Sequence, residues 1–214
     1  MTPSPTCGQC YAEQREARNQ VMTIRILTFS TILLAAGIGS AVAQDKGKMG
    51  RGPAGPGMTL TSPAFADGAE IPSKYTQSEA NPVSPKLEWT NVPANTVSFV
   101  LIMHDPDVAL QKSINDQLHW LMFNIPGTLR ELPEAVPQDQ KLPDGSVQGK
   151  NGGGVIGYRG PGAPAVGPHH HYTVELFALD SKLDVPDDVS RADVLKAMDG
   201  HILAKAVLVG RFHR

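Results

Sequence analysis

Residues 157–180 read GYRGPGAPAVGPHHHYTVELFALD, and this stretch decides the fold class. Its first half is rich in glycine and proline. Because proline lacks a backbone N–H and clashes inside helices, we expect this half to be a loop. From Tyr172 to Leu179 every second residue is apolar, which predicts a strand with one fully apolar face and one mixed face. Three consecutive histidines, residues 169–171, therefore lie where a shaped loop enters a core strand, a placement typical of binding groups.

Apolar runs elsewhere in the chain predict further strands. Residues 97–103 form a run of β-branched, aromatic and other apolar residues broken only by Ser98, which predicts a strand buried on both faces, and residues 118–125 predict the next strand. A shorter strand is predicted at residues 87–89. A closing strand is predicted at residues 201–213, with one face formed by Ile202, Ala204, Ala206, Leu208 and Phe212.

One helix is predicted between the last two strands. Ser190 is a suitable N-cap with Asp193 three residues later, and Gly200 stands where a helix commonly ends. Residues 127–154 show little apolar periodicity, so we interpret them as a long surface loop. Many short strands with proline and glycine turns predict a mainly β fold of two packed antiparallel sheets, with one or two short helices near the C-terminus.

The N-terminal part has the pattern of an export signal that begins at Met22. Arg25 supplies the positive charge, residues 26–38 form an apolar run, and residues 41–43 read Ala-Val-Ala, a small-residue cleavage pattern. We interpret residues 22–43 as a signal peptide, residues 1–21 as an extension outside the natural protein, residues 44–57 as a flexible tether and residues 58–214 as one domain. The expected location is the periplasm or the exterior. An uncleaved membrane anchor is the alternative, but the apolar run is shorter than the roughly 20 residues that a spanning helix needs.

The composition excludes several function classes. The formal net charge is −2, so no basic excess indicates a nucleic-acid partner. Cys7 and Cys10 form a single Cys-x-x-Cys pair without the two further ligands of a zinc site. Neither a Gly-x-Ser-x-Gly nor a His-Glu-x-x-His motif is present, and residues 152–154, Gly-Gly-Gly, lack the lysine of a phosphate-binding P-loop. We expect no catalytic residue, no metal and no cofactor.

Polar groups at several strand ends form a candidate binding site. An aspartate that accepts an imidazole N–H would orient that histidine and favour its charged form. Consecutive amides of a glycine-rich loop form concavities that hold phosphates, and a tyrosine hydroxyl could donate to the same anion. The candidate ligand-binding residues are Asp105, Asp107, His119, Gly160, Gly162, His170 and Tyr172.

Each part of this site also has a simpler explanation. Asp105-Pro106-Asp107 is also typical of a turn after a strand. His119, next to Trp120, is also typical of a core histidine with satisfied hydrogen bonds. His169 and His171 share a strand face at the spacing of two metal ligands, with Asp105 or His119 as a possible third, but no fixed local spacing requires a metal.

Taken together, the motifs resemble the phosphatidylethanolamine-binding protein family, specifically its bacterial Raf-kinase-inhibitor-like branch. The similarity runs in order along the chain from about residue 65 to residue 214. The motifs that carry it are Ile71-Pro72-x-Lys74-Tyr75-Thr76, Ser84-Pro85-x-Leu87-x-Trp89, Asp105-Pro106-Asp107, His119-Trp120, Gly157-Tyr158-x-Gly160-Pro161, His170-x-Tyr172 and Ala178-Leu179-Asp180.

The resemblance implies two antiparallel sheets and a small pocket for phosphate-like anions such as a phosphoethanolamine headgroup, built from the seven candidate residues. Three departures affect ligand preference. Residues 108–111 are Val-Ala-Leu-Gln where the family often has Ala-Pro-Ser-Arg, so a rim arginine is missing. His171 replaces the arginine of a His-Arg-Tyr motif, and the prolines of the loop are spread over residues 161–168.

Three functional hypotheses follow. The first is an exported, non-enzymatic binding protein that captures a small phosphate-like anion or a phospholipid headgroup. The second is an interaction module that inhibits a kinase-like or hydrolase-like protein partner through residues 127–154. The third is a weak hydrolase or metal-dependent enzyme built on Asp105, His119 and His170. The sequence favours the first, and it predicts no membrane-spanning segment after signal cleavage.

Overall fold

The computed structural model describes residues 56–108 and 115–214. The predicted N-terminal extension, the signal peptide and most of the tether lie outside the described residues. In chain order the elements are β1 (Thr59–Thr61), the short 3₁₀ turn η1 (Ser73–Tyr75), β2 (Leu87–Thr90), β3 (Ser98–Asp105), β4 (Gln117–Pro126), β5 (Glu131–Leu132), β6 (Val147–Gln148), β7 (His170–Leu179), α2 (Arg191–Met198) and β8 (Ile202–Phe212).

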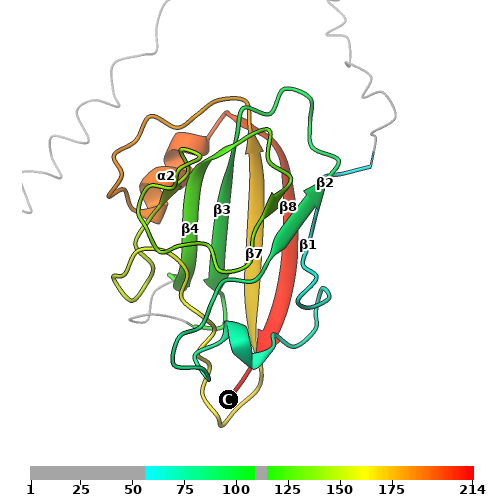
Figure 1. The fold of residues 1–214 in the computed structure, drawn as a ribbon, viewed down its shortest axis with the longest axis vertical. Coiled ribbons are helices and arrows are strands. Elements are labelled where there is room, and N and C mark those ends of the chain that lie inside the picture. Colours follow the sequence, from blue (N-terminus) through cyan, green and yellow to red (C-terminus); the bar gives the residue numbers. More distant parts are fainter. Residues whose placement is uncertain (1–55, 109–114) are drawn as a thin grey trace, which may run out of the picture. The chain divides into compact units, whose positions relative to one another are not determined.

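These strands form two antiparallel sheets, as the sequence predicts. The smaller sheet has the order β1-β2-β5 and the larger one the order β6-β4-β3-β7-β8. The long strands β4, β3, β7 and β8 run side by side (Figure 1). Within the described residues no helix is long and apolar enough to cross a membrane.

The larger sheet is covered on both faces, and β3 shows how. Phe99, Leu101 and Met103 belong to a core that also contains Leu60 of β1 and Trp89 of β2, so the small sheet packs on this face. Val100 and Ile102 point the other way, into a second core closed by Val194 and Met198 of α2. Because both faces are buried, β3 is an almost continuous apolar run instead of an alternating one.

The helix forms where its capping residues predict it. The Ser190 hydroxyl oxygen accepts a hydrogen bond from the backbone N–H of Asp193, which satisfies a donor that the first turn leaves free. Gly200 follows the helix with φ of +83°, a conformation that favours glycine. Among the described residues α2 is the one α-helix in this region, and the 3₁₀ turn lies before β2.

Two sequence-based expectations are wrong in part. Residues 127–154 are not a surface loop throughout, because β5 and β6 pair with the sheets and place Leu132 and Val147 in the cores. Two-residue strands are too short to show an alternating pattern. Ile202 is exposed because the register between β7 and β8 shifts between Ala178 and Leu179, which turns Ile202 away from the face that Ala206 and Leu208 share.

Chain direction brings the polar strand ends together. In an antiparallel sheet the end of one strand lies beside the start of its neighbours, so Asp105 at the end of β3 lies opposite Gln117 at the start of β4 and near His170 at the start of β7. This edge lies at the bottom of Figure 1, where the loop before β7 and the C-terminus are drawn.

Candidate functional site

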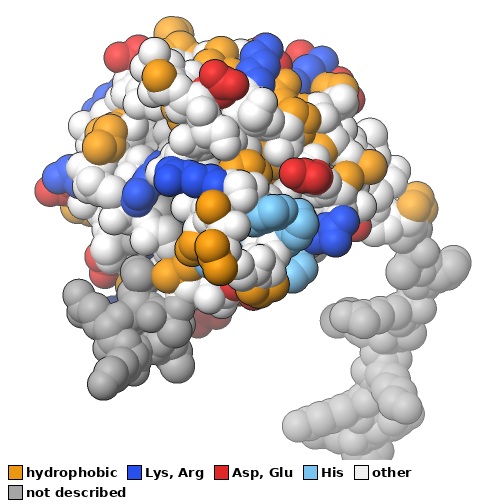
Figure 2. Space-filling view, turned by 90° about the horizontal axis from the view of Figure 1, so that it is seen from below, with side chains coloured by type: hydrophobic (Ala, Val, Ile, Leu, Met, Phe, Trp, Pro, Cys, Tyr) orange, Lys and Arg blue, Asp and Glu red, His pale blue; other side chains and the backbone are white. Residues whose placement is uncertain are grey.

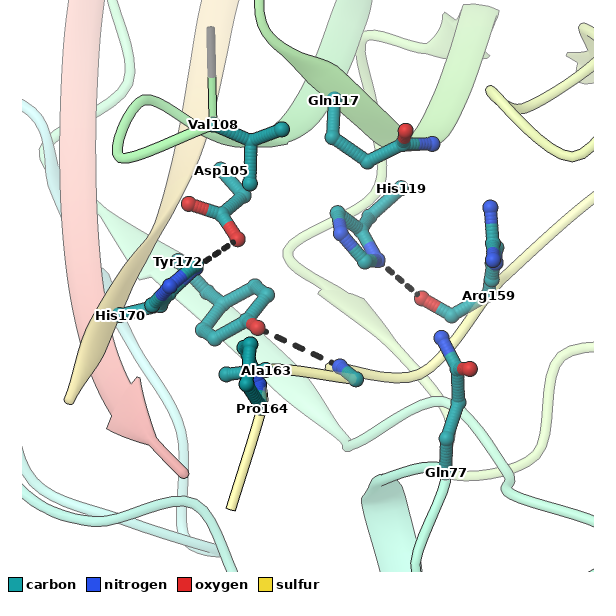
Figure 3. A pocket seen from close by; sticks show the side chains of 11 residues that line it. Gln77, Asp105, Val108, Gln117, His119, Arg159, Ala163, Pro164, His170 and Tyr172 are labelled. Carbon is teal, nitrogen blue, oxygen red and sulfur yellow. Dashed lines mark hydrogen bonds and ion pairs between the residues drawn. The ribbon is translucent and has the colours of Figure 1, made fainter. Parts of the chain in front are cut away.

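A pocket of about 230 Å³ opens at this edge, and we call it the strand-end pocket. Figure 3 shows its side chains converging from β3, β4, β7 and the loop before β7. The residues that line it are Gln77, Asp105, Val108, Gln117, His119, Arg159, Gly162, Ala163, Pro164, His170 and Tyr172. Figure 2 shows histidine side chains grouped between lysine or arginine side chains on this face of the molecule.

Asp105 orients His170. The Asp105 carboxylate is almost fully buried, with 3% of its side chain exposed, and its Oδ2 lies 2.7 Å from Nδ1 of His170. Its other oxygen accepts the backbone N–H of Asp107 at 3.0 Å, which forms the predicted turn. Since Nδ1–H donates to the carboxylate, Nε2 is the His170 atom left to meet a ligand.

A β-bulge directs His119 into the pocket. Trp120 lies opposite Met103 and Leu118 lies opposite His104, so His119 is the extra residue of β4 at a register shift. A bulge places two successive side chains on the same face, and His119 and Trp120 therefore both point toward the small-sheet side. With regular alternation His119 would face the α2 side with Leu121.

His119 is held in a neutral form. Its Nδ1 donates to the Arg159 carbonyl at 2.8 Å, and its ring packs edge-on against Tyr172 at 5.1 Å between centroids. Burial lowers the pKa of His119 below its usual value, and this effect outweighs the opposing influence of the carbonyl and of Asp105. Of the two histidines that an aspartate could orient, His170 is the one that pairs with Asp105, whereas the imidazole N–H of His119 donates to a backbone carbonyl.

Tyr172 keeps its proton. Burial, together with the neighbouring Asp105 carboxylate, raises the pKa of Tyr172 far above its usual value. The hydroxyl oxygen accepts the backbone N–H of Gly162 at 3.3 Å, and the hydroxyl proton faces the Asp105 carboxylate, which also helps to raise the pKa.

The loop before β7 needs its glycines for space. A Cβ at Gly162 would lie 2.5 Å from Nε2 of Gln77, which itself donates to the Gly160 carbonyl at 2.7 Å. A Cβ at Gly160 would lie 2.7 Å from the Tyr75 carbonyl oxygen. Gly162 thus lines the pocket, whereas Gly160 lies outside its lining and permits close packing of two backbone segments.

Asp107 also lies outside the lining of the strand-end pocket. Its Oδ2 accepts the backbone N–H of His171 at 2.6 Å and lies 3.0 Å from Nδ1 of the same histidine, on the exposed side of β7. β3 ends at Asp105, and the following turn carries Asp107 away from the face that Asp105 shares with the pocket. The structure therefore brings together five of the seven candidate residues: Asp105, His119, Gly162, His170 and Tyr172.

The sequence reasoning did not identify Gln77, Gln117 or Arg159 as lining residues. Arg159 matters most because it supplies a permanent cation to a pocket whose rim lacks the family's arginine at residues 108–111. Its position in the sequence could have indicated this role, because Arg159 is the variable third residue of the Gly-Tyr-x-Gly-Pro motif. Gln77 follows η1 and carries no motif of its own.

Histidines near the pocket pair with other groups. The rings of His169 and His213 pack edge to face at 4.1 Å between centroids, and His171 pairs with Asp107. Across residues 56–108 and 115–214, no group of three or more histidine, cysteine, aspartate or glutamate side chains is arranged to hold a metal ion.

Comparisons with known proteins agree with this architecture. A family profile described as phosphatidylethanolamine-binding protein matches residues 61–213. A UPF0098 protein of Methanothermobacter thermautotrophicus is 45% identical over 157 residues, which cover 73% of this chain and 99% of that protein. A UPF0098 protein of Aquifex aeolicus is 41% identical over 160 residues, which cover 73% of this chain and 89% of that protein.

Two solved bacterial structures share the fold. CT736 of Chlamydia trachomatis, described as a phosphatidylethanolamine-binding protein homolog, is 35% identical with a TM-score of 0.64, and the match covers 74% of this chain and 98% of that one. YbcL of E. coli, described as a member of the mammalian family, is 31% identical with a TM-score of 0.66, over 74% of this chain and 99% of that one. This chain belongs to the phosphatidylethanolamine-binding protein family.

Proposed function

We propose that the protein is a non-catalytic binding protein that captures a phosphate-type anion in the strand-end pocket. The observation that carries the proposal is the buried Asp105–His170 pair beside Arg159 in an open cavity. Arg159 supplies the charge that a phosphate group requires, and Nε2 of His170 is placed to add a hydrogen bond.

The chemistry of the lining supports capture rather than turnover. No serine, threonine, cysteine or lysine stands among the described residues that line the pocket, and the Asp105 carboxylate, which could also act as a nucleophile, already accepts two hydrogen bonds. His119 is buried and neutral, and its Nδ1 is occupied by the Arg159 carbonyl. We also propose export, on the basis of the signal-peptide pattern in residues 22–43.

Calorimetric titration of the purified chain with inorganic phosphate and with phosphoethanolamine tests the proposal. Both oxygens of Asp105 are already hydrogen-bonded, so this carboxylate has little capacity left for the amine of a headgroup. We therefore expect both compounds to bind through their shared phosphate with similar affinity. Replacement of Arg159 by glutamine should weaken both by about tenfold or more, the loss expected when a charged hydrogen bond of ~1.5–3 kcal/mol is removed. Unchanged binding by Arg159→Gln, or no binding by the wild type, would reject the proposed site.

A further inference from the structure

A second cavity adjoins the strand-end pocket, and we call it the side cavity. It has a volume of about 320 Å³, and its wall includes Asn151, Gly153 and Tyr158. Gln77 and Arg159 line both cavities, so these two side chains form the boundary between them. Arg159 carries the only permanent positive charge among the described residues that line either cavity. The cavity in which its guanidinium lies therefore has the stronger attraction for an anion.

The Arg159 guanidinium lies toward the side cavity. A Cβ built at Gly153, which lines only the side cavity, would lie 3.2 Å from Nη1 and 3.5 Å from Cζ of Arg159. Figure 3 shows that His119 stands between Arg159 and the pair formed by Asp105 and His170. The permanent charge and the buried pair are thus on opposite sides of His119, and one small anion that contacts both requires the guanidinium to move.

The side chain of Arg159 is free to move, whereas its backbone is fixed. The backbone N–H donates to the His119 carbonyl at 2.9 Å, and the backbone carbonyl accepts Nδ1 of His119 at 2.8 Å. Across residues 56–108 and 115–214 the guanidinium makes neither an ion pair nor a hydrogen bond. Rotation about the side-chain bonds can therefore carry the charge from one cavity to the other without a change in the main chain.

Gly153 provides the space for the position against the side cavity. Its backbone N–H donates to Oδ1 of Asn151 at 2.9 Å, so the turn that contains Gly153 is fixed by a side-chain hydrogen bond. Gly153 does not belong to the glycines with a positive φ, and its backbone conformation is open to other residues. What glycine contributes at this position is the absence of a side chain beside the guanidinium.

We infer that the Arg159 side chain has two positions, one against Gly153 as seen here and one in the strand-end pocket, where an anion draws the guanidinium. The inference rests on the proposed function and adds a control of affinity to it. The observed affinity is the intrinsic affinity of the pocket multiplied by the fraction of molecules with the guanidinium in place. Gly153 is the positioning residue that sets this fraction, because it leaves room for the withdrawn guanidinium.

Substitution of Gly153 tests the inference, because a side chain there takes the space of the withdrawn guanidinium. Gly153→Ala leaves a contact of 3.2 Å that a small shift of Arg159 relieves, whereas the larger side chain of Gly153→Leu fills the position. We expect phosphate affinity, measured by calorimetry, to rise about twofold in Gly153→Ala and about fivefold to tenfold in Gly153→Leu. Gly153 is exposed, so both variants should fold, and urea denaturation checks this.

The matched control is the same pair of changes in Arg159→Gln, which lacks the charge. A Cβ at Gly153 would also lie 3.1 Å from Oδ1 of Asn151, and any disturbance of the turn that follows occurs in both backgrounds. It therefore cancels in the double-mutant comparison. We expect the Gly153 changes to leave the weaker phosphate affinity of Arg159→Gln unaltered.

Amide NMR of the wild type gives a second readout. Addition of phosphate should shift the Gly153 resonance, although Gly153 lies outside the lining of the strand-end pocket, because the guanidinium leaves its neighbourhood. The same addition to Arg159→Gln should leave Gly153 unshifted. A Gly153 shift that persists in Arg159→Gln would mean that phosphate itself enters the side cavity, and it would overturn the inference.

The outcomes separate the inference from the proposed function. If the wild type binds phosphate and Arg159→Gln weakens it, but neither Gly153 variant binds more tightly, the inference is overturned and the proposed function stands. If the wild type does not bind phosphate, or Arg159→Gln binds it equally well, the proposed function fails and the inference fails with it. Tighter binding by the Gly153 variants that disappears in the Arg159→Gln background is the result that the inference predicts.

Discussion

His119 and Arg159 hold each other by two hydrogen bonds: Nδ1 of His119 donates to the Arg159 carbonyl at 2.8 Å, and the Arg159 N–H donates to the His119 carbonyl at 2.9 Å. The bulge in β4 turns the imidazole toward the loop, and the loop in turn fixes the tautomer of the imidazole. This arrangement places an arginine at the pocket through its backbone, so its side chain remains available for a ligand.

The first prediction concerns the pH dependence of stability. Because the pKa of His119 is lowered in the folded state, the unfolded chain binds a proton at higher pH than the folded one. The contribution of His119 is fully present above about pH 6.5 and is lost as the pH falls toward its folded pKa. His119→Asn keeps an N–H that can reach the Arg159 carbonyl but cannot titrate. The free energy of unfolding in urea, measured between pH 5 and pH 8, should therefore decline less on acidification in the variant. Equal declines would contradict a buried neutral His119.

A second prediction compares the two aspartates of Asp105-Pro106-Asp107. In Asp105→Asn the side-chain amide can present an N–H to Nδ1 of His170. The histidine must then adopt its other tautomer, or the contact is lost. Because the pair is buried, we expect a loss of about 1–3 kcal/mol in unfolding free energy and weaker phosphate binding. Asp107→Asn is the matched control: its pair with His171 is largely exposed and should cost about 0–1 kcal/mol with no effect on binding. If urea denaturation gave equal losses of unfolding free energy for Asp105→Asn and Asp107→Asn, burial of the Asp105–His170 pair would not matter to stability.

A third prediction separates the roles of two glycines. Gly160→Ala drives a Cβ against the Tyr75 carbonyl, which is backbone and cannot move aside, so we expect a loss of about 1–3 kcal/mol in stability. Gly162→Ala meets only the amide of Gln77, a flexible side chain, so it should mainly weaken phosphate binding.

Two further variants control for the glycine changes. Removal of the clash in Gln77→Ala/Gly162→Ala should recover the stability lost in the single Gly162→Ala variant. Gly57→Ala, where nothing lies within 4 Å of the added carbon, should leave both stability and binding unchanged. If Gly162→Ala is as destabilising as Gly160→Ala, the loop is more rigid at Gln77 than its contacts indicate.

The fourth prediction concerns the salt dependence of binding. Arg159→Gln should lower phosphate affinity and flatten its dependence on ionic strength, because the permanent charge at the pocket is lost while the backbone bonds to His119 persist. Lys150→Gln removes an exposed charge outside the lining and serves as the control. Isothermal titration calorimetry with phosphate at low and at high salt measures the affinity and its salt dependence for each variant. A similar salt dependence for Arg159→Gln and the wild type would assign the attraction to other charges.

Much of the fold follows from local patterns. The cap at Ser190, the alternation of β7 and the continuous apolar run of β3 each determine an element by short-range physical chemistry, and those elements are present. The strands of two residues and the register shift near Ile202 depend on pairing between distant segments, so no local pattern indicates them.

The site was harder to predict because it depends on turns and bulges. Asp105 and Asp107 share a face only if the strand continues, and β3 ends between them. His119 points into the pocket because β4 contains a bulge, which its sequence does not signal. Arg159 and Gln77 reach the pocket from loops whose paths are set by contacts with β4 and with each other.

The most direct test of the central claim is an imidazole ¹⁵N NMR titration of the purified chain with inorganic phosphate. The account predicts that the Nε2 resonance of His170 shifts and saturates, while the resonances of the exposed pair member His171 stay unchanged. A saturable shift at His171 with none at His170 would contradict the account.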